Sequence, residues 1–185
     1  MEYDVKELIS FIEIALRLKE ISRKGWKSEL GIKLPESVAD HSYATCVISM
    51  LVSDILGVDT LRMMKMACLH DLAEAIIGDL TPSEVSRLQK KKLEDKAIRS
   101  ILKNVPVPIR KEYCSIWDEY LKDRTEISHL VHKIDKLEMA FQAKCYLNQG
   151  YPKYLLNKFL CESYDIIRKN DNILYNLLQA LNSIK

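Results

Sequence analysis

The spacing of the apolar residues constrains the fold of this chain more than any other feature. Over most of its 185 residues they recur at intervals of three and four positions. That interval is the period of an α-helix, and no segment alternates as a half-buried strand would. Only five glycines and five prolines interrupt the pattern. The sequence therefore predicts an all-α protein, a single compact helical domain over residues 1–185 with about seven or eight helices.

Residues typical of helix ends indicate where the predicted helices begin and end. Gly57 and Gly78 follow two apolar stretches at the position where a left-handed cap ends a helix. Thr81-Pro82-Ser83-Glu84 has the pattern of a capping box and predicts a new helix start. The two helices before Gly57 and Gly78 are predicted to start at residue 37 or 40 and at residue 59 or 60, and to end at residues 56 and 77. The other predicted helices cover residues 5–19, 109–121 and 126–148, with two more within 153–184. Residues 21–38 lose the period and are predicted to be a long connection, which in compact domains is usually functional or disordered.

Composition excludes several classes of protein. Lysine and arginine number 28 against 26 aspartates and glutamates, so no basic face marks a nucleic-acid partner. The charged stretch 90–96 is interpreted as a solvated helix face. The N-terminal sequence lacks the pattern of a signal peptide, and no apolar run approaches the length of a membrane span. We expect a soluble, cytoplasmic protein with neither nucleic acid nor membrane as a partner.

The five cysteines are an odd number, lie far apart in the sequence and form no CxxC pair. Scattered cysteines in apolar contexts are most simply small core residues in a reducing compartment. The sequence indicates no histidine partner that would activate one of them as a nucleophile.

The stretch CLHDLAEAIIGDL, residues 68–80, places His70, Asp71 and Glu74 among apolar residues. On a continuous helix Glu74 follows His70 by four positions and Asp71 by three, so all three side chains can project to one side. Burying a carboxylate without partners is strongly unfavourable. Either a hydrogen-bonded His-Asp pair or salt bridge, or a divalent metal ion, would compensate.

Two further positions favour the metal. His41 opens another predicted helix, and Asp135 lies in the middle of the long helix at 126–148. With His70 and Asp71 they supply two imidazoles and two carboxylates from three helices. That set suits a borderline divalent ion such as manganese, cobalt, iron or zinc, with coordination positions left for water and substrate.

The order of these residues resembles the H…HD…D signature of the HD-domain metal-dependent phosphohydrolases. Four longer segments resemble the 5′-deoxynucleotidase branch of that superfamily: RKGW at 23–26, PESVADHS at 35–42, HDLAEAIIGDLTP at 70–82 and KIDKLEMAFQA at 133–143. The resemblance covers roughly residues 5–165. It implies one compact helical HD-type domain, usually a homodimer, that removes phosphate from deoxyribonucleoside 5′-monophosphates.

The resemblance also implies a metal site made of His41, His70, Asp71 and Asp135. Manganese or cobalt is the favoured ion, with magnesium, iron, zinc and nickel as further candidates. Glu74 would orient or deprotonate the attacking water and pass a proton to the leaving oxygen.

The resemblance assigns the remaining site residues to the substrate. Asp79 would bind the sugar hydroxyl or assist the proton transfer, and Arg23 would clamp the phosphate. Trp26 would either wall the sugar pocket against a ribose hydroxyl or serve as a plain core anchor. In the bacterial pattern the arginine directly precedes the tryptophan, whereas two residues intervene here, so Arg23, Lys24 and Lys27 are all candidates for the clamp.

His129 and His132 share the helix of Asp135. Both are interpreted as structural or surface residues, with His132 a weaker candidate for the pocket.

Two other functions stay open. An HD phosphohydrolase acting on a nucleoside triphosphate or an alarmone would use the same metal site, but the short chain offers little sequence for a triphosphate-binding cluster. A non-catalytic metal-binding helical module is the second alternative. Such a module would not require Glu74 and Asp79 beside the metal ligands.

Overall fold

The structure, a computed structural model, describes residues 3–183, apart from the side chains of residues 155, 182 and 183. Over this range the chain forms ten α-helices and two 3₁₀ turns, and its only β-type pairing is an isolated bridge between Ser22 and Ser37. The all-α prediction is confirmed. The helices are α1 (Val5–Arg17), α2 (Lys24–Leu30), α3 (Val38–Leu56), α4 (Thr60–Leu69), α5 (Glu74–Ile77), α6 (Arg87–Ile101), α7 (Val107–Lys122), α8 (Glu126–Asn148), α9 (Lys153–Ile166) and α10 (Ile173–Ser183). None of the helices in the described range is long and apolar enough to cross a membrane.

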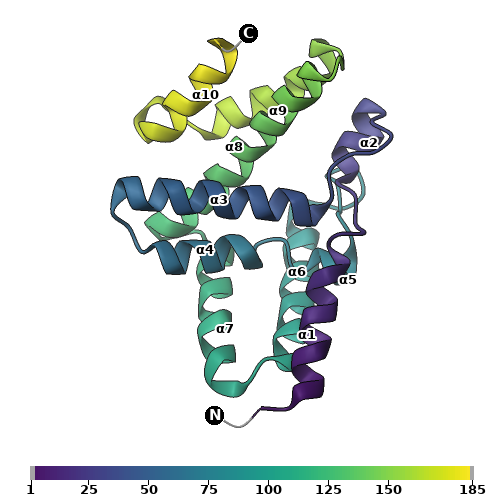
Figure 1. Ribbon diagram of the computed structural model, residues 1–185, viewed down its shortest axis with the longest axis vertical. Coiled ribbons are helices and arrows are strands. Elements are labelled where there is room, and N and C mark those ends of the chain that lie inside the picture. The colour runs from purple at the N-terminus through teal and green to yellow at the C-terminus, as the bar shows by residue number, and fades with distance from the viewer. Residues whose placement is uncertain (1–2, 184–185) are drawn as a thin grey trace.

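Helix α3 lies at the centre of the molecule, packed along α4 and across α8. In Figure 1, α1, α6 and α7 extend to one side of the α3–α4 pair, and α8, α9 and α10 rise on the other. The main core joins these elements through fully buried side chains such as Val52, Met66, Ile98 and Ile134. The elements that carry the predicted metal ligands therefore meet in the middle of the fold.

The predicted connection at residues 21–38 contains an additional helix. Helix α2 buries Trp26 and Leu30 in a smaller apolar cluster with residues of α8 and α9, and Gly31 ends it in the left-handed conformation, at φ 66°. Seven residues are too few for a periodic pattern to be recognised in the sequence. The tertiary contacts of these two side chains stabilise the helix instead.

The predicted helix at 59–77 is broken. Helix α4 ends at Leu69, and α5 begins only at Glu74. Between them the backbone winds more tightly, with the amides of Glu74 and Ala75 bonded three residues back, to Asp71 O at 3.0 Å and Leu72 O at 3.2 Å. Because a 3₁₀ turn rotates each residue further than an α-helix does, Glu74 does not lie on the helix face below His70.

The predicted helix start at Thr81 is also wrong, although the local contacts form. The Thr81 amide donates to the Glu84 carboxylate at 2.9 Å, but only a turn follows. Glu84 is held by Lys24 of α2 at 2.8 Å as well. The next helix, α6, starts at Arg87 with its own capping box from Ser86.

Candidate metal centre and active-site cavity

Four predicted ligands converge from α3, the end of α4 and α8. His41 Nε2 lies 3.2 Å from Asp135 Oδ1 and 3.6 Å from Asp71 Oδ2. His70 Nε2 lies 3.2 Å from the same Asp71 oxygen and 3.3 Å from His41 Nε2. Both imidazoles are buried. The fold thus brings together the two histidines and two aspartates that the sequence proposed as one set.

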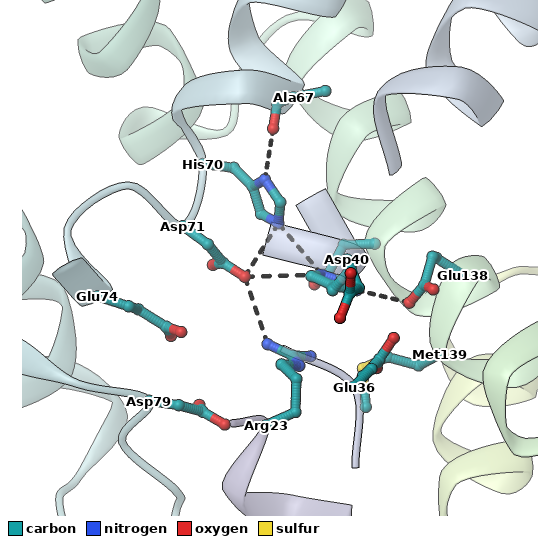
Figure 2. A network of polar contacts seen from close by, with 12 residues as sticks. Arg23, Glu36, Asp40, Ala67, His70, Asp71, Glu74, Asp79, Glu138 and Met139 are labelled. Carbon is teal, nitrogen blue, oxygen red and sulfur yellow. Dashed lines mark hydrogen bonds and ion pairs between the residues drawn. The ribbon is translucent and has the colours of Figure 1, made fainter. Parts of the chain in front are cut away.

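The Nδ1 atom of each imidazole, on the side away from the cluster, has a partner that only accepts hydrogen bonds. His70 Nδ1 donates to the Ala67 carbonyl at 2.7 Å (Figure 2). His41 Nδ1 donates to Glu138 Oε2 at 2.5 Å. In the neutral rings both Nε2 atoms therefore present lone pairs toward each other and toward two carboxylates. Such an arrangement is repulsive unless a cation lies between the four atoms, and it is the arrangement found around protein-bound metals.

The spacing of the ligand atoms of His41, His70 and Asp71 fits one ion. For metal-ligand bonds of about 2.1 Å, two ligands at tetrahedral corners are about 3.4 Å apart. The separations among these three residues run from 3.2 to 3.6 Å, and Asp135 adjoins them through its 3.2 Å contact with His41. The residues present therefore fit a divalent metal ion.

Without an ion, a proton supplies the missing positive charge. Burial and Arg23 both act to lower the pKa of His41, but hydrogen bonds to Asp135 and Glu138 outweigh them and raise it to about 9. Burial acts to raise the pKa of Asp71, yet the charges of His70 and Arg23 hold it well below the usual range. Metal binding must therefore release protons from this cluster.

A cavity of about 570 Å³ adjoins the cluster and is of the size that binds small ligands. Asp71 and Asp135 line it from the metal cluster. Arg23 also lines it, with Nη1 3.3 Å from Asp71 Oδ2. Asp79 lies at the same wall and accepts the Lys24 amide at 2.6 Å. The cavity thus combines carboxylates with a guanidinium suited to phosphate.

Glu74 is fully buried and keeps one oxygen free of partners. Its Oε1 accepts from Lys90 Nζ at 3.1 Å, and its Oε2 has no hydrogen-bond partner among the described residues. Figure 2 shows this carboxyl directed toward the space between Asp71, Asp79 and Arg23. Burial, together with the charge of Asp71, raises the pKa of Glu74 to about 8 despite the nearby Lys90. An unpartnered buried carboxyl oxygen with this pKa is well placed to accept a proton near neutral pH.

Among the three clamp candidates, only Arg23 contacts the metal cluster. Lys24 points its ammonium group to Glu84, and Lys27 is exposed. Trp26 lines the cavity but is 1% exposed, donates to Glu36 at 2.7 Å and packs against Phe159 with ring centroids 4.2 Å apart. It is therefore a core anchor that also forms cavity wall.

The two remaining histidines lie in different environments. His132 lines the cavity and stacks on Tyr120, with ring centroids 4.1 Å apart, whereas His129 is exposed.

Three residues of the site were missed by the sequence analysis. Lys90 was interpreted as part of a solvated face, yet it reaches Glu74 because α6 packs on α5. Glu138 was not singled out, although it follows Asp135 by three positions and so shares its helix face. Glu36 lies within the segment PESVADHS; burial and Glu138 raise its pKa to about 7, and its carboxylate accepts from Trp26.

The chain belongs to the HD domain family, whose profile matches residues 15–173. Proteins of this family are metal-dependent, in keeping with the cluster described above. The chain is 35% identical to the 5′-deoxynucleotidase HDDC2 of Dictyostelium discoideum, over 84% of this chain and 85% of that protein. It is 37% identical to the protein of the same name from Danio rerio, over 83% and 76%. A conserved hypothetical protein from Pyrococcus furiosus has the same fold, with a TM-score of 0.76 and 35% identity over 95% of this chain and 99% of that one.

We predict that Glu138→Gln weakens metal binding. The amide keeps the shape of the side chain but no longer holds His41 with a negative charge, and loss of such a partner typically lowers metal affinity about 10- to 100-fold. Isothermal titration with manganese measures the change. Glu126→Gln, an exposed glutamate at the start of the same helix, is the matched control. Unchanged affinity in Glu138→Gln would contradict the role of this carboxylate.

We predict that Lys90→Met moves the acidic limb of the kcat profile to higher pH. The Lys90 charge lowers the pKa of Glu74, so its removal raises that pKa and leaves less ionised Glu74 at a given pH. Lys90→Arg should restore the profile, and Lys92→Met on the exposed side of α6 should leave it unchanged. A pH profile of Lys90→Met that overlays the native one would refute this prediction.

Proposed function

We propose that this protein is a metal-dependent phosphomonoesterase that hydrolyses deoxyribonucleoside 5′-monophosphates to deoxynucleoside and phosphate. The observation that carries the proposal is the convergence of His41, His70, Asp71 and Asp135 beside a cavity lined by Arg23. The names of the relatives support the substrate class.

In this proposal the four converging side chains hold the ion, which when bound supplies a water of lowered pKa and neutralises charge on the phosphate. Arg23 binds the phosphate oxygens through its guanidinium fork. The free oxygen of Glu74 takes the proton from the attacking water, while Lys90 fixes the other oxygen. As the bond between phosphorus and the sugar oxygen breaks, the proton passes to that oxygen.

The sugar end of the substrate is assigned to Asp79 and Trp26. The Asp79 carboxylate accepts one hydrogen bond from a backbone amide and retains acceptor capacity for a sugar hydroxyl or for the proton transfer. The Trp26 ring is held rigidly by Glu36 and Phe159. A fixed wall of this kind disfavours the additional hydroxyl of ribose.

Manganese or cobalt is the ion that we favour. Two imidazoles and two carboxylates form a mixed donor set for borderline divalent ions, and iron, zinc, nickel and magnesium are the other candidates.

Phosphate release from a panel of deoxy- and ribonucleoside mono-, di- and triphosphates tests the proposal. Each substrate is assayed with manganese, cobalt or magnesium, and with a chelator. We expect release from deoxyribonucleoside 5′-monophosphates with at least manganese or cobalt, and none with chelator. Absence of monophosphate hydrolysis with every metal would refute the proposed function, and preference for triphosphates would favour the other HD phosphohydrolase activity.

We also propose that the protein forms a homodimer in the cytoplasm. One face of α3 exposes a group of large apolar side chains: Tyr43, Val47, Met50 and Leu51. Exposed apolar groups of this kind often mark an interface between proteins. Light scattering coupled to size-exclusion chromatography should give a molar mass of twice the chain mass. The Val47→Lys protein should have the mass of a single chain. A native mass of one chain would refute the dimer.

A further inference from the structure

Two of the five cysteines lie in contact, contrary to the expectation from the sequence. Cys46 on α3 and Cys68 on α4 place their sulfur atoms 3.2 Å apart. Cys68 is exposed and Cys46 is partly buried. None of the other three cysteines is buried either, so the interpretation of the five as small core residues is wrong.

The surrounding packing holds the two backbones at this spacing. Thr45 and Ala67, the neighbours of the two cysteines in sequence, are fully buried, and α3 packs along α4 over its length. A disulfide has an S–S distance of about 2.05 Å, so roughly 1 Å of approach separates the contact from the bond. Side-chain rotation provides a movement of that size without separating the helices.

We propose that Cys46 and Cys68 form a site of reversible oxidation that closes a disulfide between α3 and α4 in the presence of a peroxide. The Cys68 sulfur attacks one peroxide oxygen, the O–O bond breaks, and a sulfenic acid and one water result. The Cys46 sulfur then displaces the sulfenic hydroxyl, which leaves as a second water when it takes the Cys46 proton. Two thiols are oxidised by two electrons in total, and the peroxide is reduced to water. A dithiol reductant reverses the reaction.

The position of the pair gives the crosslink a structural consequence. Cys68 precedes His70 by two residues and directly follows Ala67, whose carbonyl accepts a hydrogen bond from His70 Nδ1 at 2.7 Å. The disulfide joins this segment to the helix that carries His41. The inference does not depend on the proposed activity, because it rests on the contact between the two thiols.

The test uses the full chain with Cys114, Cys145 and Cys161 all replaced by serine, so that only the pair remains. One equivalent of hydrogen peroxide is added with a chelator present, and intact mass and peptide maps are recorded. We expect a mass decrease of two hydrogen atoms in the monomer, a Cys46–Cys68 linked peptide, and recovery of both thiols with dithiothreitol.

A Cys68→Ser control and the native chain test whether the crosslink is specific to this pair. The same background with Cys68→Ser should show no mass decrease. In the native chain the linked peptide should join Cys46 to Cys68 rather than to any of the other three cysteines. A monomer that gains oxygen atoms without losing two hydrogens, or a linked peptide that excludes either residue, would overturn the proposal.

Discussion

Glu74→Gln is expected to bind the metal ion as the native protein does and to lose turnover by about 100- to 10,000-fold. The amide preserves the volume of the side chain, and Glu74 is not one of the four converging ligands. The substitution removes the carboxylate, one oxygen of which has no partner in the described part of the chain and is placed to take a proton. The measurements are metal content of the purified protein and kcat at saturating substrate.

The control for this substitution is Glu112→Gln. Glu112 is an exposed carboxylate on α7 paired with Lys65, so the chemical change is the same but lies away from the metal cluster and the cavity beside it. We expect native kcat for it. Native kcat in Glu74→Gln, or loss of metal together with activity, would contradict the separation of ligand from proton acceptor.

Asp71→Asn is expected to lose both the metal ion and the activity. Asp71 contacts His41, His70 and Arg23 at once, with the same oxygen at 3.6, 3.2 and 3.3 Å. The asparagine amide is a poorer ligand for a divalent ion than the carboxylate, and it leaves Arg23 without its charge partner. We expect metal affinity and kcat/KM to fall by at least about 1,000-fold, a drop of about 4 kcal/mol in each free energy.

Circular dichroism must show that the Asp71→Asn protein is folded before its activity is interpreted. Asp118→Asn, which removes a partly exposed carboxylate paired with Arg99, is the matched control and should retain metal and activity. An Asp71→Asn protein with full metal content would show that the ion binds elsewhere.

The long helices were predictable because their own apolar periodicity encodes them. Helices α3 and α8 begin and end within a few residues of the predicted limits, and Gly57 ends α3 in the left-handed conformation as expected. The break after Leu69 was not predictable in the same way. The sequence of residues 69–77 has an unbroken helical pattern, and only the tighter hydrogen bonding around Asp71 in the fold separates α5 from α4.

The metal ligands were predictable from residue types and order, whereas their supporting residues depend on tertiary structure. Lys90 stands in a charged run that a solvated helix would also have, and its contact with Glu74 exists only because α6 packs on α5. The sequence did carry a signal for Glu138, a glutamate one turn after Asp135 on an apolar helix. The second cysteine of the Cys46–Cys68 pair lies 22 positions away, and no sequence period links the two.

Anomalous diffraction from a crystal soaked in manganese tests the central claim most directly. Two groups of side chains in the described residues are close enough to hold an ion, and both include His41: one adds His70 and Asp71, the other adds Glu36 and Glu138. We predict a manganese peak bonded to His41 Nε2, His70 Nε2 and the carboxylates of Asp71 and Asp135. A peak between Glu36, His41 Nδ1 and Glu138 instead, or no peak on the four predicted ligands, would contradict the account.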